Sequence, residues 1–196
     1  MKKVIVKCKL KDRDQFEQKL TEIDMDFAPM YWQHDRVYVP RNYQKRSSYP
    51  RLVLRTEMRA VDRPPRYQLI LRRHIEDSGI DIVDATPITD YSEAANIILQ
   101  LGFEQQAEVS LRRQELVLGD HTRMFLDKID GMAGYFAKIE AELADGDKVE
   151  DVRADLIHTF SVLGQPADSI TEDTYSDSSS HRISPPHPAF STKTQA

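Results

Sequence analysis

Basic residues recur at every second position in several separate segments of this chain, and this pattern constrains the fold more than any other feature. Between Lys3 and Leu10 the even positions are apolar and three of the odd positions are lysines. A period of two is typical of a β-strand. Four segments have such cations, namely Lys3, Lys7 and Lys9; Arg51, Arg55 and Arg59; Arg72 or Arg73; and Arg112 or Arg113.

Four strands with one basic face each can face water or turn toward one another. On a single strand, ordinary solubilising charge is the simpler explanation, but the recurrence over four strands favours a sheet curled around a basic interior. Such an interior needs an anion, because burying a charge without a partner is costly. Guanidinium groups bind phosphate oxygens through paired hydrogen bonds, so the pattern predicts a polyphosphate ligand.

Further strand-like runs and a few helices complete the expected fold. We expect strands at residues 30–39, 51–59, 67–73, 106–118, 122–129 and 135–143. Helices are expected after Asp12 or Asp14, after Asp90, which acts as a cap, and over residues 149–163, and Gly102 and Gly164 end the last two. Many antiparallel strands with covering helices predict an α+β domain. The segment 41–50, rich in Arg, Ser and Tyr, is a candidate lid.

The length of 196 residues fits one domain and a tail. We expect the domain over residues 1–175. Residues 176–196 are rich in Ser, Pro and His and offer little to bury, so they are expected to be disordered.

Composition narrows the partners and the location. The net charge of −5 is too mild for the whole chain to bind nucleic acid or a membrane, so we expect neither partner. Lys7 and Lys9 interrupt the apolar run that a signal peptide needs, and no segment approaches the length of a membrane span. Cys8 is the only cysteine, which excludes an internal disulfide and a multi-cysteine zinc site, and it is expected to pack in the core. The expected location is the cytoplasm.

Carboxylates gather in a predicted hairpin, LDKIDGMAGYFAKIEAEL, at residues 126–143. Asp127 lies on its first strand, whereas Glu140 and Glu142 lie on the second and share a face because they are two residues apart. The hairpin could aim three acids at a small region, and acids opposite basic strands can hold a divalent metal and a polyphosphate together. An ordinary hairpin with a solvated acidic face is the alternative.

Short motifs recur along the chain in a characteristic order: KVIVK near the start, Gln33-His34-Asp35 leading to Tyr38, LVLR ending at Arg55, LILR ending at Arg72, LGF at 101–103, Arg113 within SLRR, Leu126-Asp127, and GYFAKIE ending at Glu140. In this order and spacing the chain resembles the CYTH superfamily, the fold shared by class IV adenylate cyclases, thiamine triphosphatases and inorganic triphosphatases. The resemblance extends to Tyr175.

The resemblance implies an eight-stranded antiparallel tunnel-like barrel with covering helices. It implies that the basic walls bind a triphosphate and that acids hold Mg²⁺ or Mn²⁺. The residues that it assigns to substrate binding are Lys7, Arg55, Arg72 and Arg113, with Lys7 also catalytic. The metal ligands that it implies are Asp127 and Glu140, with Glu142 as the best replacement for an absent ligand.

Several acidic positions of the family pattern are changed in this chain. The opening E-x-E-x-K falls on Lys3, Ile5 and Lys7, so both glutamates are absent, and the first glutamate of the final strand falls on Lys138. The residues that bind anions are therefore kept better than the metal ligands. Candidate replacements for the glutamates are Asp84, Glu57 and Glu142.

Two functions are consistent with these residues. The first is a divalent-metal-dependent enzyme, an adenylate cyclase or a triphosphatase, that acts on ATP, thiamine triphosphate or tripolyphosphate. The second, favoured by the absent glutamates, is a catalytically weak or inactive binder of a nucleotide or polyphosphate. The sequence does not choose between cyclase and hydrolase, because both use the same tunnel. It also leaves the oligomeric state open, with a homodimer as one expectation.

Overall fold

The computed structural model describes residues 1–42, 49–75 and 80–171. Within these ranges the elements are β1 (Lys2–Lys9), α1 (Arg13–Thr21), β2 (Tyr31–Pro40), β3 (Arg51–Met58), β4 (Arg66–Ile75), β5 (Ile80–Ile88), α2 (Tyr91–Gln100), β6 (Phe103–Gly119), β7 (Thr122–Ile129), β8 (Phe136–Glu142), α3 (Val149–Val162), a 3₁₀ turn (Ala167–Ser169) and the short β9 (Ile170–Thr171). Residues 43–48 of the candidate lid at 41–50 and the tail at 176–196 lie outside the described residues, so the lid, the expected domain boundary and the disorder stay predictions. The homodimer also stays a prediction.

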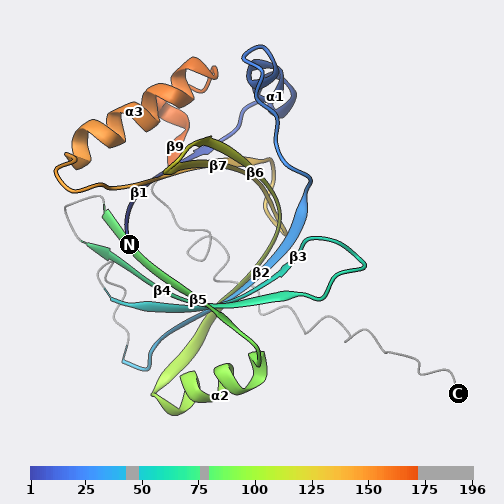
Figure 1. Cartoon of the computed structure of the whole chain (residues 1–196), viewed down its shortest axis with the longest axis vertical. Helices are drawn as coiled ribbons and strands as arrows, with labels where there is room; N and C mark the ends of the chain where they lie inside the picture. Colours follow the sequence, from blue (N-terminus) through green and yellow to red (C-terminus); the bar gives the residue numbers. More distant parts are fainter. Residues whose placement is uncertain (43–48, 76–79, 172–196) are drawn as a thin grey trace, which may run out of the picture.

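The strands form one sheet that closes on itself. Its order is β5-β4-β3-β2-β6-β7-β8-β1-β9, and β1 also pairs antiparallel with β5 through Lys2↔Ile82, Lys3↔Asp81 and Val4↔Ile80. Figure 1 shows the resulting ring, with α1 and α3 on one side and α2 on the opposite side. The predicted eight-stranded antiparallel barrel with covering helices is confirmed.

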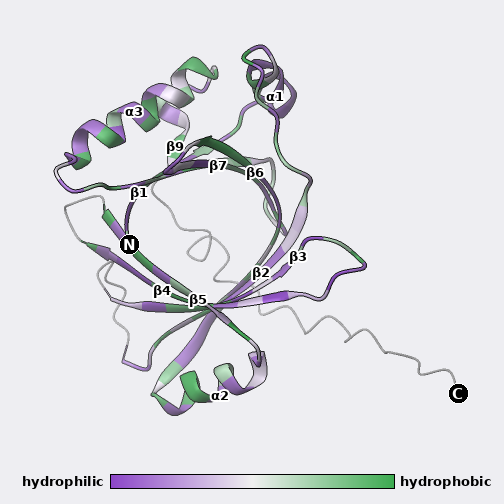
Figure 2. Cartoon of the chain, in the orientation of Figure 1, coloured by the Kyte–Doolittle hydropathy of each residue, from purple (hydrophilic) through white to green (hydrophobic). Residues whose placement is uncertain are grey.

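The largest apolar cluster lies outside the barrel, between the strands and the helices. On β1, Val4, Val6 and Cys8 are buried in this cluster with Phe16 of α1 and Phe160 of α3. The prediction that Cys8 packs in the core is confirmed. Figure 2 shows hydrophobic and hydrophilic residues alternating along α2 and α3, as expected for helices that cover a sheet with one face. The polar faces of the strands are therefore left for the interior.

Local signals set the helix ends. The Asp90 side chain accepts a hydrogen bond from the Glu93 backbone N–H at 2.9 Å and caps α2. Gly102 follows that helix at φ 87°, a conformation in which a side chain would be strained. Asp12, rather than Asp14, caps α1 by accepting from the Gln15 N–H at 3.1 Å.

One barrel strand, β5, has no counterpart among the strands predicted from alternation. Its sequence, IDIVDATPI, is partly exposed and ends near Pro87, which discourages a strand prediction. Pro87 is tolerated because this part of β5 pairs only with β4 in the described residues, at Gln68. Among the described helices, none is long and apolar enough to cross a membrane.

Candidate functional site

Most of the basic residues that stand at alternate positions in the sequence lie on the inner face of the barrel. Residues paired across neighbouring strands share a face. The registers Lys7↔Lys138, Arg113↔Asp127 and Asp35↔Arg55 therefore place charged side chains of six strands on one face. Arg51↔Arg72 adds a pair of cations from β3 and β4.

The register also decides which member of each double arginine faces inward. Arg72 and Arg113 line the interior pocket. Arg73 is exposed. Arg112 lies on the outer face, with its guanidinium carbon 5.9 Å from the centre of the Trp32 ring.

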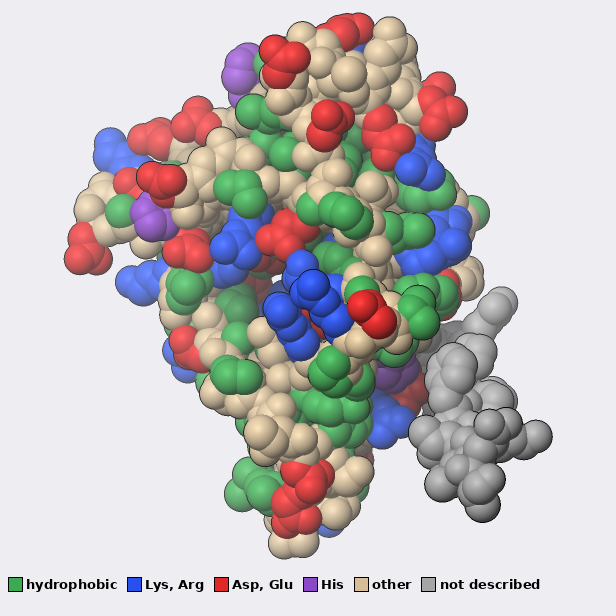
Figure 3. Space-filling view, turned by 45° about the vertical axis from the view of Figure 1, so that its right-hand side comes forward, with side chains coloured by type: hydrophobic (Ala, Val, Ile, Leu, Met, Phe, Trp, Pro, Cys, Tyr) green, Lys and Arg blue, Asp and Glu red, His purple; other side chains and the backbone are tan. Residues whose placement is uncertain are grey.

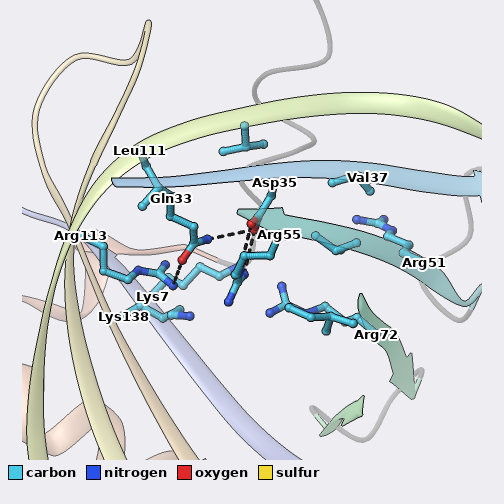
Figure 4. Close-up of a pocket in the computed structure, with 13 residues that line it drawn as sticks. Lys7, Gln33, Asp35, Val37, Arg51, Arg55, Arg72, Leu111, Arg113 and Lys138 are labelled. Carbon is cyan, nitrogen blue, oxygen red and sulfur yellow. Dashed lines mark hydrogen bonds and ion pairs between the residues drawn. The ribbon is translucent and has the colours of Figure 1, made fainter. Parts of the chain in front are cut away.

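A pocket lies inside the barrel, and residues of β1, β2, β3, β4, β6 and β8 line it. Figure 3 shows Lys and Arg side chains gathered beside a hollow on the surface, and Figure 4 shows the pocket residues converging from these strands. All four predicted substrate-binding residues line it. The complete lining is Lys7, Gln33, Asp35, Val37, Arg51, Val53, Arg55, Ile70, Arg72, Val109, Leu111, Arg113 and Lys138.

Arg113 is held by two partners. Its Nε and Nη2 donate to the two carboxylate oxygens of Asp127 at 2.6 and 2.7 Å, and its Nη1 donates to Gln33 Oε1 at 3.0 Å. Arg113 is 3% exposed and Asp127 is 0% exposed. Such a paired geometry is the strongest form of an arginine–carboxylate contact, so Arg113 is fixed in place.

Arg55 is held in the same way by Asp35. Its Nε and Nη2 donate to the Asp35 oxygens at 2.8 Å each, and Gln33 Nε2 donates to Asp35 Oδ2 at 3.0 Å. Gln33 thus joins the two arginine–carboxylate pairs, as the dashed lines in Figure 4 show. Burial alone would raise the pKa of Asp35, but the charge and hydrogen bonds of Arg55 hold that pKa below its ordinary value.

Two lysines share the carboxylate of Glu140. Lys138 donates to Oε1, and Lys3 donates to Oε2 at 3.0 Å. Burial would raise the pKa of Glu140, yet the two ammonium groups hold it well below the ordinary value. Burial lowers the pKa of Lys138 to about 7, against the attraction of Glu140 and with added repulsion from Arg113.

Arg72 adds a cation that lacks full compensation. Its Nε is buried and has no hydrogen-bond partner within the described residues. With the ion-pair partners named above, the lining contains three carboxylates, Asp35, Asp127 and Glu140, and seven cations, Lys3, Lys7, Arg51, Arg55, Arg72, Arg113 and Lys138. The pocket is therefore strongly positive, although the chain as a whole is negative.

The two remaining acid candidates lie elsewhere. Glu57 faces inward but pairs with Arg59 at 3.1 Å. Arg59 also contacts Glu115 at 3.5 Å, and Glu115 pairs with Arg123 at 3.0 Å, so two arginines balance these two carboxylates. Asp84 is 62% exposed and binds the N-terminal ammonium group of Met1 at 2.9 Å.

The hairpin register separates the predicted metal ligands. Asp127 pairs with Phe136, and Glu140 pairs with Arg123. Four residues along a strand span about 13 Å, so Asp127 and Glu140 cannot share one ion in this arrangement. Glu142, the third acid, lies 3.5 Å from His121 Nδ1. The expectation that the hairpin aims all three acids at one small region is wrong, and no group of three His, Cys, Asp or Glu suited to a metal occurs among the described residues.

The acids of this hairpin therefore do not fit a divalent cation as they stand. Both oxygens of Asp127 accept from Arg113, and both oxygens of Glu140 accept from lysines. Metal binding by Asp127, Glu140 and Glu142 stays a prediction.

Sequence reasoning missed Lys138 and Gln33 as parts of the pocket. The family resemblance marks Lys138 only as a changed acidic position. A signal was available, because Lys138 lies two residues before Glu140 and must share its face in a strand. Gln33 gave the same kind of signal, because it lies two residues before Asp35 in a quoted motif, but its role of joining two arginine–carboxylate pairs depends on other strands.

The fold and the pocket together define a barrel protein with a cationic tunnel. The model of the CYTH domain matches residues 47–175, and the chain belongs to this family. No curated protein matches the chain in sequence.

Solved structures share the fold at low sequence identity. The PH1819 protein from Pyrococcus horikoshii OT3 has a TM-score of 0.75 at 18% identity, over 88% of this chain and 95% of that one. A candidate adenylate cyclase from Vibrio parahaemolyticus has a TM-score of 0.74 at 19% identity, over 89% and 95%. A candidate adenylyl cyclase from Hippeastrum, described as having a dominant triphosphatase activity, has a TM-score of 0.58 at 14% identity, over 89% and 93%.

Proposed function

We propose that this protein binds the triphosphate group of a small molecule inside its barrel. The observation that carries the proposal is the buried Nε of Arg72, which has no hydrogen-bond partner within the described residues and lies in a pocket with a marked excess of cations. A buried donor without a partner costs free energy, and a phosphate oxygen would satisfy it.

The other arginines are arranged to receive such an anion. Asp35 engages Nε and Nη2 of Arg55, which fixes the side chain and leaves Nη1 as its remaining nitrogen for a ligand. Asp127 and Gln33 fix Arg113 in the same wall. Groups that are already oriented lose little entropy when a ligand binds.

An enzymatic reaction is the second candidate, supported by the names of the structural relatives. The reaction would be hydrolysis of a triphosphate or cyclisation of ATP, with Lys7 stabilising the charge that develops on the phosphate. Bound Mg²⁺ or Mn²⁺ would supply further charge neutralisation, but the hairpin acids do not fit such an ion as they stand. Binding is therefore the primary proposal.

A thermal-shift titration with tripolyphosphate tests the binding proposal. A ligand that binds only the folded state stabilises it by about 2.7 kcal/mol at 100 times its Kd. We expect the wild type to melt at a higher temperature with ligand. Arg72→Met should remove this shift without lowering the melting temperature of the free protein, because it replaces an incompletely compensated cation.

Arg73→Met is the matched control, since the neighbouring side chain is exposed and does not line the pocket. It should keep the full shift. The proposal fails if millimolar tripolyphosphate leaves the wild type unchanged, or if both variants respond alike.

Phosphate release from ATP, thiamine triphosphate and tripolyphosphate, measured in parallel with Mg²⁺ and with Mn²⁺, tests the enzymatic candidate. Turnover that disappears in Lys7→Ala would support it. Absence of phosphate release and of a cyclic nucleotide product from every substrate would leave binding as the function.

A further inference from the structure

The inner faces of β1 and β8 bring two ammonium groups onto one carboxylate in the wall of the tunnel. We propose that Lys3 and Lys138 stand in for a divalent cation, so that the tunnel binds a triphosphate without metal. This inference rests on the proposed function and specifies how the same site neutralises its ligand.

The first argument concerns the oxygens that a metal would need. Hard divalent cations bind several oxygen ligands at once. Glu140 contacts the lining residue Lys138, and each of its oxygens already accepts from a lysine. Its side chain is 11% exposed, and Asp127 lies four residues away in register.

The second argument is electrostatic. A divalent ion on Glu140 would displace Lys3 and Lys138, whose side chains are only 17% and 6% exposed. Two displaced ammonium groups would then lie near a charge of the same sign, in a region where water screens poorly. The existing arrangement avoids this repulsion, because the two ammonium groups share the Glu140 carboxylate and no further cation is added.

The third argument is that Lys138 is already positioned toward the ligand. Its Nζ lies 4.4 Å from the centre of the Phe125 ring, and the guanidinium carbon of Arg113 lies 4.6 Å from the same centre. Lys138 also lines the pocket beside its register partner Lys7. An ammonium group has three donors, so the hydrogen bond to Glu140 leaves two for a phosphate oxygen. The ring and the carboxylate thus orient the Lys138 ammonium group where a bound metal would otherwise be needed.

Calorimetric titration of the full chain with tripolyphosphate tests the inference, once in EDTA and once with excess Mg²⁺, at mildly acidic pH. We expect the wild type to bind in EDTA, with Mg²⁺ giving no tighter binding. Lys138→Met should weaken the metal-free affinity by about tenfold, the loss expected for one charge-assisted hydrogen bond.

Lys2→Met is the matched control, because Lys2 is exposed on the same strand and does not line the pocket. It should bind like the wild type. Circular dichroism of each variant checks the fold.

A charge-reversed variant, Lys3→Glu with Lys138→Glu, provides a second measurement. It places three carboxylates together, so it should lose affinity in EDTA and recover at least about tenfold with Mg²⁺. The paramagnetic resonance signal of free Mn²⁺ should decrease on adding this variant and should not decrease on adding the wild type.

Three outcomes would overturn the inference. If the wild type binds tripolyphosphate only with Mg²⁺, the proposed function stands, but the inference that Lys3 and Lys138 replace a metal is wrong. Binding of micromolar Mn²⁺ by the wild type would likewise contradict the inference and leave the proposed function standing. An absence of binding under both conditions removes the proposed function and the inference with it.

Discussion

Arg113 and Asp127 form a two-pronged ion pair in the interior of the barrel, with N–O distances of 2.6 and 2.7 Å and no exposure of the carboxylate. The pair joins β6 to β7 and, through Gln33, to β2. The pair therefore stabilises the barrel in the first place. It affects ligand binding only by orienting the Arg113 side chain.

Asp127→Ala should destabilise the protein strongly. Removing one member of a buried pair leaves the other charge without compensation, which costs about 3–5 kcal/mol. Chemical denaturation measures this loss. Asp84→Ala is the control, because that exposed carboxylate binds only the terminal ammonium group among the described contacts, and its effect should stay within about 0.5 kcal/mol. A stability loss below about 1 kcal/mol for Asp127→Ala would contradict the structural role.

Glu140→Gln should separate the two functional candidates by the sign of its effect. The change removes a negative charge from a site for an anion, so metal-free affinity for tripolyphosphate should rise by about tenfold, the size of one charge interaction across about 12 Å at an effective dielectric of about 20. If Glu140 were instead a metal ligand, Mg²⁺-dependent binding or turnover would fall. Glu142→Gln, on the same strand face but half-exposed near His121, should change affinity much less.

Triphosphate affinity should fall as pH rises from about 7 to 9. The folded-state pKa of Lys138 is lowered by burial to about 7, so the ammonium group that attracts the anion is lost across this window, in which phosphate groups are already ionised. The charged groups that act on it are Glu140, Arg113, Asp127 and Arg72. Calorimetry at several pH values measures the slope, and Lys138→Met should flatten it.

The same titration affects the free protein with the opposite sign. Between the folded pKa of about 7 and the ordinary lysine value of about 10.4, the unfolded chain binds more protons than the folded one. This group therefore makes the folded state more stable as pH rises through that range. If neither the triphosphate affinity nor the stability of the wild type changes with pH above 7, Lys138 stays fully protonated in the barrel.

Part of this structure could be predicted from residues alone. The alternation in β1 separates Val4, Val6 and Cys8 from Lys3 and Lys7, and the two sets do lie on opposite faces. Asp90 and Gly102 mark the ends of α2 because capping is local chemistry. The closed barrel came from the family resemblance, since closure depends on the contact of β1 with β5, and β5 lacks the alternation that identifies a strand.

The site was harder to predict because it depends on register. Adjacent arginines, such as Arg72 and Arg73, differ only in which face they occupy, and neighbouring strands decide that. The prediction that the acids of the β7–β8 hairpin converge was wrong for the same reason. Its turn, with Gly131 and Gly134 at positive φ, sets Asp127 opposite Phe136, and a shift of a few residues would have placed different acids together.

The position of the main apolar core outside the barrel allows the cavity to evolve separately from the scaffold. Because Val4, Phe16 and Phe160 pack on the outside of the barrel, a substitution at Lys3 or Lys138 does not touch the layer that joins strands to helices. A lineage can therefore reverse the charge of its cavity, and with it the ions that the cavity accepts, while the scaffold persists. In this architecture, ligand chemistry and folding are selected on opposite sides of the same sheet.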